Sequence, residues 1–418
     1  MNPRPCAQFD FSKVLRAGDV VTWLQGTGEP AGLTRQLVTQ RAELPRVTIF
    51  VGISASDTLL PAHADHFDFK ALNGAGNNRR LAAAGVLDIV PAHVSKVPGL
   101  IRARALKVDV MLVRVRPHPK PGFYSVGVMA DFARAMVGAA RCVIGELDER
   151  MPVTSQDALI PCDAVHHLTT ADCDEWLMPD GEPAPIDIQV AQQVASVIPD
   201  RATIQIGIGS LPVAVCQALM SHRELGVHSG VICDGIVDLI EKGVITNAHK
   251  GLDAGRTVTG GLFGGRRLMD WANGNALLDM RSSDHTHSPL VMAQLNNFYS
   301  VNSAIEVDLT GQLNSEIAAG RYLGAIGGQA DYVRGAQLSP GGRSIIAMAS
   351  ATPDGKYSRI VASLKGAPVT TARADVDLIV TEYGVADLRG ASMRERAKRL
   401  TAIAHPDFRE PLAAAAQG

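Results

Sequence analysis

The sequence predicts an α/β protein made of two open α/β domains of similar architecture. Three observations predict this fold: β-branched runs alternate with helix-forming stretches, the alternation restarts after a proline-rich segment, and the chain is long enough for more than one core. Alternating strands and helices are typical of βαβ units around a parallel sheet. In the first half the β-branched runs are VTIFVGIS (47–54), VLDIVPA (86–92), VDVMLVRVRP (108–117) and ARCVIGEL (140–147).

A domain boundary is predicted in the segment 178–188, MPDGEPAPIDI, which holds three prolines and one glycine. Such a composition is typical of a linker. Because one domain usually takes roughly 100–200 residues, we expect an N-terminal α/β domain over 1–180 and a C-terminal α/β domain over 189–418. The second half begins with the helical run AQQVASVI and continues with RATIQIGIGSLPVAVCQAL, GVICDGIVDLIEKGVI, SIIAMAS and VDLIVTEYGVADLRG.

The composition excludes several classes of protein. Hydrophobic residues make up 46% and charged residues 20% of the chain, and the formal net charge is −2, so a globular protein without nucleic-acid partners is expected. No stretch approaches the roughly 18 apolar residues of a spanning helix, and the N-terminus lacks the apolar core of a signal peptide. We therefore expect a cytoplasmic protein without membrane association. The cysteines lack CxxC spacing and are expected to be reduced, mostly structural thiols: Cys6, Cys142, Cys162, Cys173, Cys216 and Cys233.

The most readable local signal is ATIQIGIGSLPVAVCQAL, in which an alternating strand ends at Gly207 and Pro212 opens a helix. Proline fits the first helical turn because its missing N–H would have no partner there. Glycines at 207 and 209 let the backbone approach a bound group, and the N–H groups of such a turn favour an anion or a developing oxyanion. The alternative is a tight strand-to-helix turn without a ligand.

A second glycine cluster is GAIGGQADYVRGAQLSPGGRSIIAMAS, residues 324–350. Such loops permit close approach of the backbone to a ligand, and Arg334 and Arg343 could meet phosphate groups. Two ordinary turns with solvated arginines would produce the same pattern.

Two other patterns point to no site. The stretch GGLFGGRRL (260–268) lacks the strand-then-helix setting of a dinucleotide fingerprint, so we interpret it as a loop. The histidine pairs, His166 with His167 and His285 with His287, lack the i, i+4 spacing of helical metal ligands. No metal site is expected.

Read in order, several blocks resemble the acetyl-CoA hydrolase/transferase family, and within it the branch of the 4-hydroxybutyrate CoA-transferases. The resemblance extends over nearly the whole chain and is densest from about Gly207 to Glu410. Six collinear blocks are far more specific than any one of them. The blocks are IGIGSLP, LGVHSGVICDGIVDLIEKGVITN, VNSAIEVDLTGQLNSE, GGQADYVRGA, TEYGVADLRG and IAHPDFRE.

The resemblance implies two open α/β domains with the acyl-CoA site in a cleft between them. It also implies a ping-pong reaction in which a glutamate carboxylate attacks the thioester. In such enzymes the turn matching Gly207 and Gly209 supplies oxyanion-hole N–H groups, and the loop matching 324–329 lies against CoA. The residues that the resemblance assigns to CoA binding are Ile208, Ser210, Leu211, Gly324, Gly327, Gly328, Gln329 and Arg343.

One position departs from the family pattern. Relatives carry the nucleophilic glutamate in a pattern like HSE followed by a hydrophobic residue, whereas this chain has Gly230 in the sequence His228-Ser229-Gly230-Val231. Glycine has no carboxylate. A transferase needs a nucleophile that holds the acyl group and later CoA, so another residue must serve or transfer by this route is lost.

Three carboxylates are candidates for that role. Asp57 follows the strand VTIFVGIS, and loops beyond the carboxyl ends of parallel strands hold the sites of open α/β sheets. An N-cap or turn aspartate before TLL is the alternative interpretation of Asp57. Glu29 lies in a glycine-rich turn and is expected to be structural or to face the substrate. Glu306 alternates within a strand and could equally be paired with a basic neighbour.

Three functions follow from these observations. The first is CoA transfer between short-chain acyl-CoA and a carboxylate acceptor, with Asp57 as the carboxylate nucleophile. The second is acyl-CoA hydrolysis with a carboxylate as the base for water, and the third is CoA binding without turnover. We expect the transferase, with CoA as part of the substrate, small-molecule carboxylates as the other partners, and a homodimer as the oligomeric state.

Overall fold

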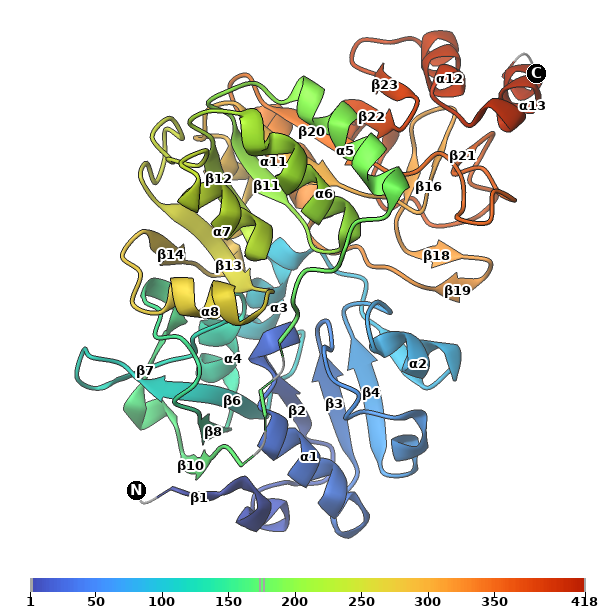
Figure 1. The fold of residues 1–418 in the computed structure, drawn as a ribbon. Coiled ribbons are helices and arrows are strands. Elements are labelled where there is room, and N and C mark those ends of the chain that lie inside the picture. The colour runs from blue at the N-terminus through green and yellow to red at the C-terminus, as the bar shows by residue number, and fades with distance from the viewer. Residues whose placement is uncertain (1–2, 173, 176, 417–418) are drawn as a thin grey trace. The chain divides into compact units, whose positions relative to one another are not determined.

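A computed structural model describes residues 3–172, 174–175 and 177–416 (Figure 1). The chain divides into two compact units. The first unit contains residues 1–179, 258–286 and 321–327, and the second contains 180–257, 287–320 and 328–418. The second unit begins at Asp180, inside the segment predicted as a linker. Neither unit is one continuous half of the chain, because two later segments return to the first unit.

A large parallel sheet organises the first unit. Its strands are β1 (Arg4–Pro5), β2 (Val20–Trp23), β3 (Val47–Val51), β4 (Phe67–Ala71), β5 (Leu87–Ile89), β6 (Val110–Pro117), β7 (Phe123–Ser125), β8 (Cys142–Leu147), β9 (Leu159–Pro161) and β10 (His167–Thr170). The order is β1-β10-β8-β6-β2-β3-β4-β5 with every pair parallel, and β7 pairs antiparallel with β6 and β9. The central strand β6 is buried over six consecutive residues, as expected for a strand covered on both faces.

Short helices complete the core of the first unit. They are α1 (Ala31–Gln40), α2 (Asn78–Ala83), α3 (Val97–Arg102) and α4 (Ala133–Ala139). Leu33 and Leu37 of α1 are fully buried against Val21, Ile49 and other residues of the sheet. Each side chain of this size contributes about 1.5–3 kcal/mol when it leaves water. The same parallel arrangement brings the loops after β2, β3, β4 and β5 to one edge of the sheet.

The segment 258–286 belongs to the first unit and corrects one sequence-based expectation. It contains most of β13 (Thr257–Leu262), followed by α8 (Arg266–Ala272), β14 (Leu278–Met280) and α9 (Ser283–Thr286). The stretch 260–268 is therefore a strand, a short turn and a helix, and its interpretation as a loop was wrong. A Cβ atom at Gly261 would lie 2.4 Å from Cε of Met129, so glycine here allows a close approach between chain segments rather than a loop.

Six strands, most of them parallel, organise the second unit. They are β11 (Thr203–Ile206), β12 (Gly226–Ile232), β15 (Phe298–Asn302), β20 (Arg343–Ala347), β22 (Leu378–Thr381) and β23 (Gly384–Asp387). They follow the order β12-β11-β15-β20-β22-β23, and only the β22–β23 pair is antiparallel among the described pairs. Parallel neighbours require crossover connections, which the helices of this unit supply.

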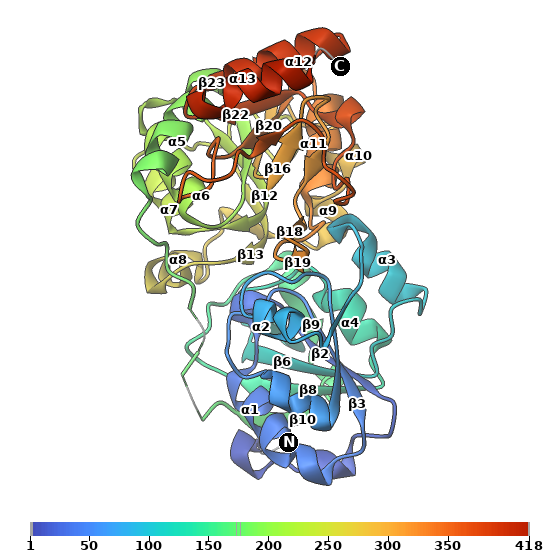
Figure 2. The same ribbon diagram turned by 90° about the vertical axis from the view of Figure 1, so that its right-hand side faces the viewer.

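Helices cover both faces of this second sheet. They are α5 (Pro185–Val197), α6 (Ser210–Ala218), α7 (Asp234–Glu241), α10 (Pro289–Met292), α11 (Gln329–Leu338), α12 (Met393–Ala402) and α13 (Pro406–Ala415). Figure 2 shows α5, α6 and α7 on one side of the strands and α10 and α11 on the other. The predicted class, two open α/β domains, is confirmed. Helix α5 begins at Pro185, within the predicted linker, because proline suits the first helical position.

Small β elements complete the fold. They are β16 (Glu306–Asp308), β17 (Leu313–Asn314), β18 (Ile317–Ala318), β19 (Arg321–Tyr322) and β21 (Ile360–Val361). In the second unit, β16 pairs antiparallel with β17 and parallel with β21. Val307, Leu313 and Ile360 from these strands are fully buried in a core cluster of the second unit.

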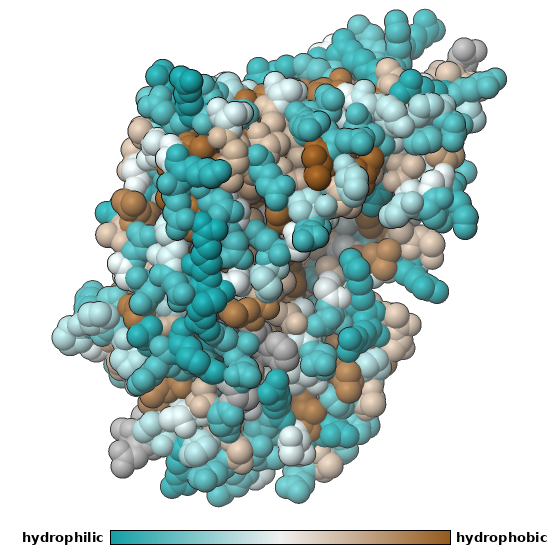
Figure 3. Space-filling view, viewed as in Figure 1, coloured by the Kyte–Doolittle hydropathy of each residue, from teal (hydrophilic) through white to brown (hydrophobic). Residues whose placement is uncertain are grey.

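The face of the molecule seen in Figure 3 is mostly hydrophilic, with hydrophobic residues scattered in small groups. No helix in the described ranges combines the length and the apolar character that crossing a bilayer requires. Five cysteines are free thiols: Cys6, Cys142, Cys162, Cys216 and Cys233. Cys173 lies outside the described residues.

Candidate functional site

The glycine turn of the second unit lies where the sequence predicts it. Strand β11 ends at Ile206, and α6 begins at Ser210. Gly209 has a φ of 113°, a conformation that residues with a side chain rarely adopt. No side chain caps the N-terminus of α6. The turn therefore presents backbone N–H groups at the carboxyl end of a parallel strand, which suits an anion or an oxyanion.

The space around this turn is open. A Cβ atom at Gly207 or at Gly209 would meet no heavy atom within 4 Å in the structure. Ile208 and Leu211 are half-buried, and Ser210 is exposed. Packing against neighbouring residues therefore does not explain the glycine at 207, whereas backbone conformation explains the glycine at 209.

Gly230 has no such open space. It lies inside β12, and a Cβ atom there would be 2.5 Å from Cε1 of His287, 2.7 Å from Nε2 of His287 and 2.7 Å from the hydroxyl oxygen of Tyr332. Real Cβ atoms essentially never come closer than 3.0 Å to another heavy atom. Two aromatic side chains thus fill the volume into which a side chain at 230 would extend.

A second glycine, Gly328, leaves room for the side chain of His287. Gly328 caps the N-terminus of α11, and its Cβ atom would lie 2.4 Å from Cδ2 of His287. The rings of His287 and Tyr332 are in contact, with centroids 4.7 Å apart and planes tilted by 47°. We call His287, Tyr332, Gly230 and Gly328 the histidine seat. Its two glycines, on different elements, leave the room that the imidazole occupies.

The histidine seat is uncharged near neutral pH. Burial lowers the pKa of His287 to about 3, so its imidazole is neutral at pH 7. Burial also raises the pKa of Tyr332 well above its ordinary value, so the phenol keeps its proton. A group with neither a carboxylate nor a positive charge therefore occupies the space beside Gly230, the position at which the family resemblance implies a nucleophilic glutamate. Strand β12 cannot supply a carboxylate nucleophile.

Asp57 lies in the first unit, in the loop that follows β3. Its side chain is exposed, whereas its neighbour Ser56 is 2% exposed. No hydrogen bond or ion pair joins Asp57 to another described residue. The carboxylate is thus accessible, and a role for Asp57 as a nucleophile stays a prediction.

The other two carboxylates have clear partners. Glu29 is 1% exposed, and its Oε1 accepts hydrogen bonds from Oγ of Ser56 at 2.7 Å and from Oγ1 of Thr34 at 3.0 Å. Glu306 accepts a hydrogen bond from Nδ2 of Asn314 at 2.9 Å. Its partner is therefore a neutral amide rather than the basic neighbour that the sequence suggested.

The predicted CoA loop is divided between the two units. Gly324 and Gly327 belong to the first unit, where the carbonyl of Gly324 accepts from N of Gly74 at 3.1 Å and that of Gly327 accepts from N of Val94 at 3.1 Å. These bonds attach the loop to the segments that follow β4 and β5. Gly328 and Gln329 belong to the second unit.

Gln329 and Arg343 differ in their settings. Gln329 is 7% exposed, its Oε1 accepts from Oγ of Ser315 at 2.6 Å, and its Nε2 has no hydrogen-bond partner among the described residues. Arg343 begins β20 and pairs with Tyr299 of β15, which in turn pairs with Ile204 of β11. At about 3.3 Å per residue, this position is roughly 10 Å back along the strands from Gly207. The structure does not bring Arg343 to the glycine turn.

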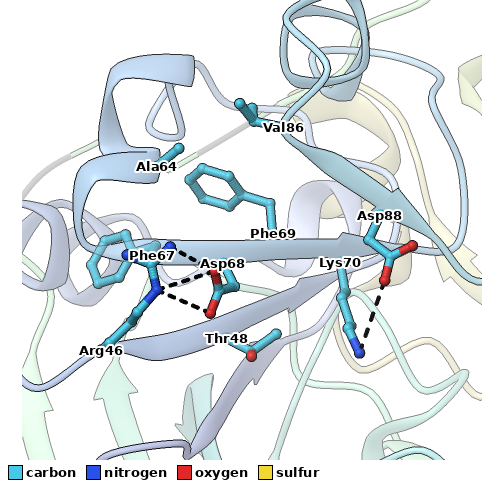
Figure 4. A pocket seen from close by; sticks show the side chains of 9 residues that line it. All are labelled: Arg46, Thr48, Ala64, Phe67, Asp68, Phe69, Lys70, Val86 and Asp88. Atoms are coloured by element: carbon cyan, nitrogen blue, oxygen red, sulfur yellow. Dashed lines mark hydrogen bonds and ion pairs between the residues drawn. The ribbon is translucent and has the colours of Figure 1, made fainter.

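A hollow of about 520 Å³ in the first unit has none of the predicted site residues in its lining. Figure 4 shows that Phe69, Ala64 and Val86 face one part of it. Its basic groups are paired, Arg46 with Asp68 at 2.7 Å and Lys70 with Asp88 at 4.0 Å. With its cations neutralised, the hollow has no net charge to attract the phosphates of CoA.

Known proteins that resemble this chain identify its family. Residues 9–179 match the sequence model of the acetyl-CoA hydrolase/transferase N-terminal domain, and residues 264–416 match that of the C-terminal domain. The chain is 37% identical to the 4-hydroxybutyrate coenzyme A transferase of Clostridium kluyveri over 94% of this chain and 92% of that protein. The chain belongs to the acetyl-CoA hydrolase/transferase family.

Other members of the family agree with this result. The succinyl-CoA:cyclohexane-1-carboxylate CoA transferase of Geobacter metallireducens is 33% identical over 99% of this chain and 94% of that protein. The crystal structure of RipA from Yersinia pestis superposes with a TM-score of 0.91 at 32% identity, covering 97% of this chain and 94% of that chain. The resemblance stated from the six sequence blocks is confirmed.

The histidine seat is the part of the site that sequence reasoning missed. The pair His285 and His287 was considered only as a metal motif, and Tyr332 was not singled out. A signal was nevertheless present, since Gly230 lies inside the stretch GVHSGVI, which forms β12. Such glycines often mark a close approach by another group.

Proposed function

We propose that this chain is a CoA-transferase that moves CoA between a short-chain acyl-CoA and a carboxylate acceptor. The observation that carries the proposal is its 37% identity, over 94% of its length, to a curated 4-hydroxybutyrate coenzyme A transferase. The open glycine turn after β11 supports it, because a thioester that is attacked by a nucleophile develops negative charge on its carbonyl oxygen.

The proposed nucleophile is the carboxylate of Asp57. Its attack on the thioester carbonyl carbon gives an aspartyl–acyl anhydride and releases CoA thiolate. The thiolate then attacks the aspartyl carbonyl, which forms an Asp57 thioester and frees the first carboxylate. An acceptor carboxylate then attacks the Asp57 thioester, which gives a new anhydride and releases CoA thiolate. The thiolate attacks the acceptor's acyl carbon, so that the new acyl-CoA forms and the Asp57 carboxylate is regenerated. Every bond broken is matched by one formed, and no oxidant, reductant or metal is needed.

The glycine turn is proposed to stabilise the oxyanion of each addition step. The backbone N–H groups at Gly207 and Gly209 are the donors in this proposal, with Ile208, Ser210 and Leu211 beside the bound acyl-CoA. The residues Gly324, Gly327, Gly328, Gln329 and Arg343 stay predicted contacts of CoA. Among them, the buried Nε2 of Gln329 is a donor to which a ligand oxygen could bind.

The exposed setting of Asp57 supports carboxylate chemistry, and it also favours a second activity. Water can reach an exposed carboxylate, so the anhydride and thioester intermediates should hydrolyse slowly in the absence of an acceptor. Acyl-CoA hydrolysis is therefore the alternative function. The two are distinguished by whether an acceptor carboxylate is required for turnover.

One assay tests the proposal. Purified protein is incubated with acetyl-CoA or butyryl-CoA, with and without acetate, succinate or itaconate, and the acyl-CoA products are separated by chromatography. Acceptor-dependent formation of a new acyl-CoA is the expected result. Asp57→Asn should reduce this exchange by several orders of magnitude, as removal of a nucleophile generally does. Asp88→Asn, at another exposed aspartate of the first unit, is the matched control and should retain activity.

The outcomes separate the three functions. Free CoA that appears at the same rate with and without acceptor means a hydrolase, and CoA binding without turnover means a binding protein. A fully active Asp57→Asn variant would remove Asp57 from the mechanism. We further propose a metal-independent, cytoplasmic homodimer, which EDTA treatment, cell fractionation and light scattering after size-exclusion chromatography test in turn.

A further inference from the structure

The loop that carries Asp57 is attached to the preceding loop of the same sheet edge. Nitrogen of Gly26 donates to the carbonyl of Ile53 at 2.7 Å, and nitrogen of Ile53 donates to Oε1 of Gln25 at 3.1 Å. The third connection is the hydrogen bond from Oγ of Ser56 to Glu29 at 2.7 Å. The loops after β2 and β3 therefore form one hydrogen-bonded layer at the carboxyl ends of their strands.

Ser56 is the centre of this attachment. Its hydroxyl oxygen accepts from N of Thr58 at 3.2 Å while the hydroxyl hydrogen goes to Glu29. Its carbonyl accepts from Oγ of Ser54 at 3.2 Å and from Nδ2 of Asn77 at 2.7 Å. Four hydrogen bonds fix the residue immediately before Asp57, and Leu59, two residues after Asp57, is 5% exposed. Asp57 is thus exposed to solvent, whereas Ser56 and Leu59 on either side of it are buried.

Glu29 is the one ionisable group in this attachment. Its carboxyl group is fully buried beside neutral partners: Ser56 and Thr58 from the Asp57 loop and Thr34 from α1. The charged group that faces it is Glu146 on β8, whose own carboxylate accepts from N of Leu33 at 2.8 Å. No hydrogen bond of the proposed reaction passes through Glu29, so the transfer mechanism leaves this buried carboxyl group without a role.

We propose that Glu29 is a positioning residue, whose carboxyl group holds Ser56 and thereby fixes the direction in which Asp57 presents its carboxylate. The inference rests on the proposed function in that it takes Asp57 as the nucleophile. A nucleophile must be held within a fraction of an ångström of its productive position, and a loop achieves this only with supporting hydrogen bonds. In this proposal Glu29 does not contact the substrate, and its effect on the reaction passes through Ser56 to the Asp57 loop.

The strength of this support depends on pH. Burial raises the pKa of Glu29 to about 7, and the hydrogen bond from Ser56 acts in the opposite direction. Because that hydrogen bond stabilises the ionised carboxylate, ionisation must strengthen it in return. The Asp57 loop should therefore be held more tightly as the pH rises through about 7. The wild-type transfer rate should rise over the same interval.

Four variants test the proposal. Glu29→Ala removes the anchor, and Ser56→Ala removes the hydroxyl group that connects the anchor to the loop. Because that hydroxyl also accepts from N of Thr58, the Thr58 amide is left out of the comparison for Ser56→Ala. Glu29→Gln keeps an oxygen acceptor for Ser56 but cannot ionise. Thr34→Val is the matched control, because Thr34 donates to the same Oε1 from α1 and not from the Asp57 loop.

Two measurements are made on each full-length variant. Hydrogen–deuterium exchange with mass spectrometry follows the amides of residues 54–58, corrected for the intrinsic effect of pH, and the transfer assay gives kcat and KM between pH 5.5 and 8.5. Glu29→Ala and Ser56→Ala should exchange these amides at least about tenfold faster and lose kcat with little change in KM. Glu29→Gln should keep slow amide exchange and lose the rise in kcat near pH 7. Thr34→Val should keep slow amide exchange and the rise in kcat, with that rise moved to higher pH because a hydrogen bond that lowers the pKa of Glu29 is lost.

The results separate this inference from the proposed function. If Glu29→Ala does not fold, Ser56→Ala decides the amide-exchange comparison. Unchanged exchange of residues 54–58 in Ser56→Ala, or a pH profile of Glu29→Gln that superposes on the wild type, overturns the positioning role. If the wild type shows no transfer, or if Asp57→Asn stays active, the proposed nucleophile fails, and faster amide exchange in Glu29→Ala would still establish the anchor.

Discussion

Replacement of Gly230 by alanine should destabilise the protein, although alanine usually improves a strand. The new Cβ atom would lie 2.5 Å from Cε1 of His287 and 2.7 Å from the Tyr332 oxygen, whereas Cβ atoms essentially never come within 3.0 Å of such an atom. One side must therefore move by about half an ångström inside a packed core, where overpacking costs about 1–3 kcal/mol. The gain in backbone entropy from glycine to alanine is about 0.5–1 kcal/mol. A net loss on the order of 1 kcal/mol is expected, within a range of about 0–2.5 kcal/mol.

Urea unfolding, followed by circular dichroism, measures this loss. Gly181→Ala is the matched control in the same unit, because nothing lies within 4 Å of its added Cβ atom. That variant should differ from the wild type by less than about 0.5 kcal/mol. A double-mutant cycle with His287→Ala assigns the cause, since removal of the imidazole should relieve the clash and give a coupling of about 1 kcal/mol.

The same reasoning applies to Gly230→Glu, the change that introduces the residue type that the family resemblance implies at this position. The carboxylate of the new side chain would be buried beside a neutral imidazole and a protonated phenol. The Gly230→Glu variant should therefore be less stable than Gly230→Ala and should not increase CoA transfer. Equal stability of Gly230→Ala and the wild type, with no coupling to His287→Ala, would refute the histidine seat. A gain of transfer in Gly230→Glu would show that the volume is open to a nucleophile.

Three further predictions concern Gly207, Glu29 and Gln329. Gly207→Ala should fold normally, because nothing lies within 4 Å of the added methyl group, and should lower kcat on the order of 100-fold if that methyl displaces the oxyanion from one donor; normal kcat would make the turn purely structural. Burial raises the pKa of Glu29 from 4.5 to about 7, so the folded state binds more protons than the unfolded state between those values. The free energy of unfolding should therefore fall by about 3 kcal/mol from this group as the pH rises from 4.5 to 7. Glu29→Gln should lack that slope in urea unfolding at pH 5 and pH 8, and an unchanged slope would contradict the raised pKa. Gln329→Ala should raise the KM for acyl-CoA with kcat held if its buried amide binds CoA, and an unchanged KM would remove Gln329 from the binding site.

Local sequence patterns were sufficient to predict several elements of the fold, although the end of β13 and the start of α8 were interpreted as a loop. The run VTIFVGIS predicts β3 (Val47–Val51), and the strand, turn and helix around Gly207 occur in the predicted order. What the patterns could not indicate is which compact unit a segment joins. Residues 258–286 follow strands of the second unit in the sequence but pack with the first, because their partners, such as Val128 and Ala130, are more than 100 residues away.

Only part of the site could be predicted, because here too local patterns are visible in the sequence and contacts between distant residues are not. A glycine turn after a strand is a local signal, and the missing glutamate at 230 is visible in the sequence alone. The histidine seat is not local, since Gly230, His287 and Tyr332 come from three separate stretches of the chain. For the paired glycines before Arg343 the sequence left both a ligand loop and an ordinary turn open. In the structure, Cβ atoms at Gly341 and Gly342 would lie 2.1 Å from Oδ1 of Asn297 and 2.2 Å from the Ala336 carbonyl oxygen, so close approach within the chain explains both glycines.

The central claim is that a carboxylate outside β12, that of Asp57, carries CoA during transfer. Its most direct test is to incubate the protein with butyryl-CoA without acceptor, reduce it with borohydride, and locate the modified residue by peptide mass spectrometry. Reduction of an aspartyl thioester gives homoserine, and we predict that this product appears at Asp57 and is absent from Asp57→Asn. A modified residue at Glu29, Glu306 or elsewhere, with Asp57 intact, would contradict the account.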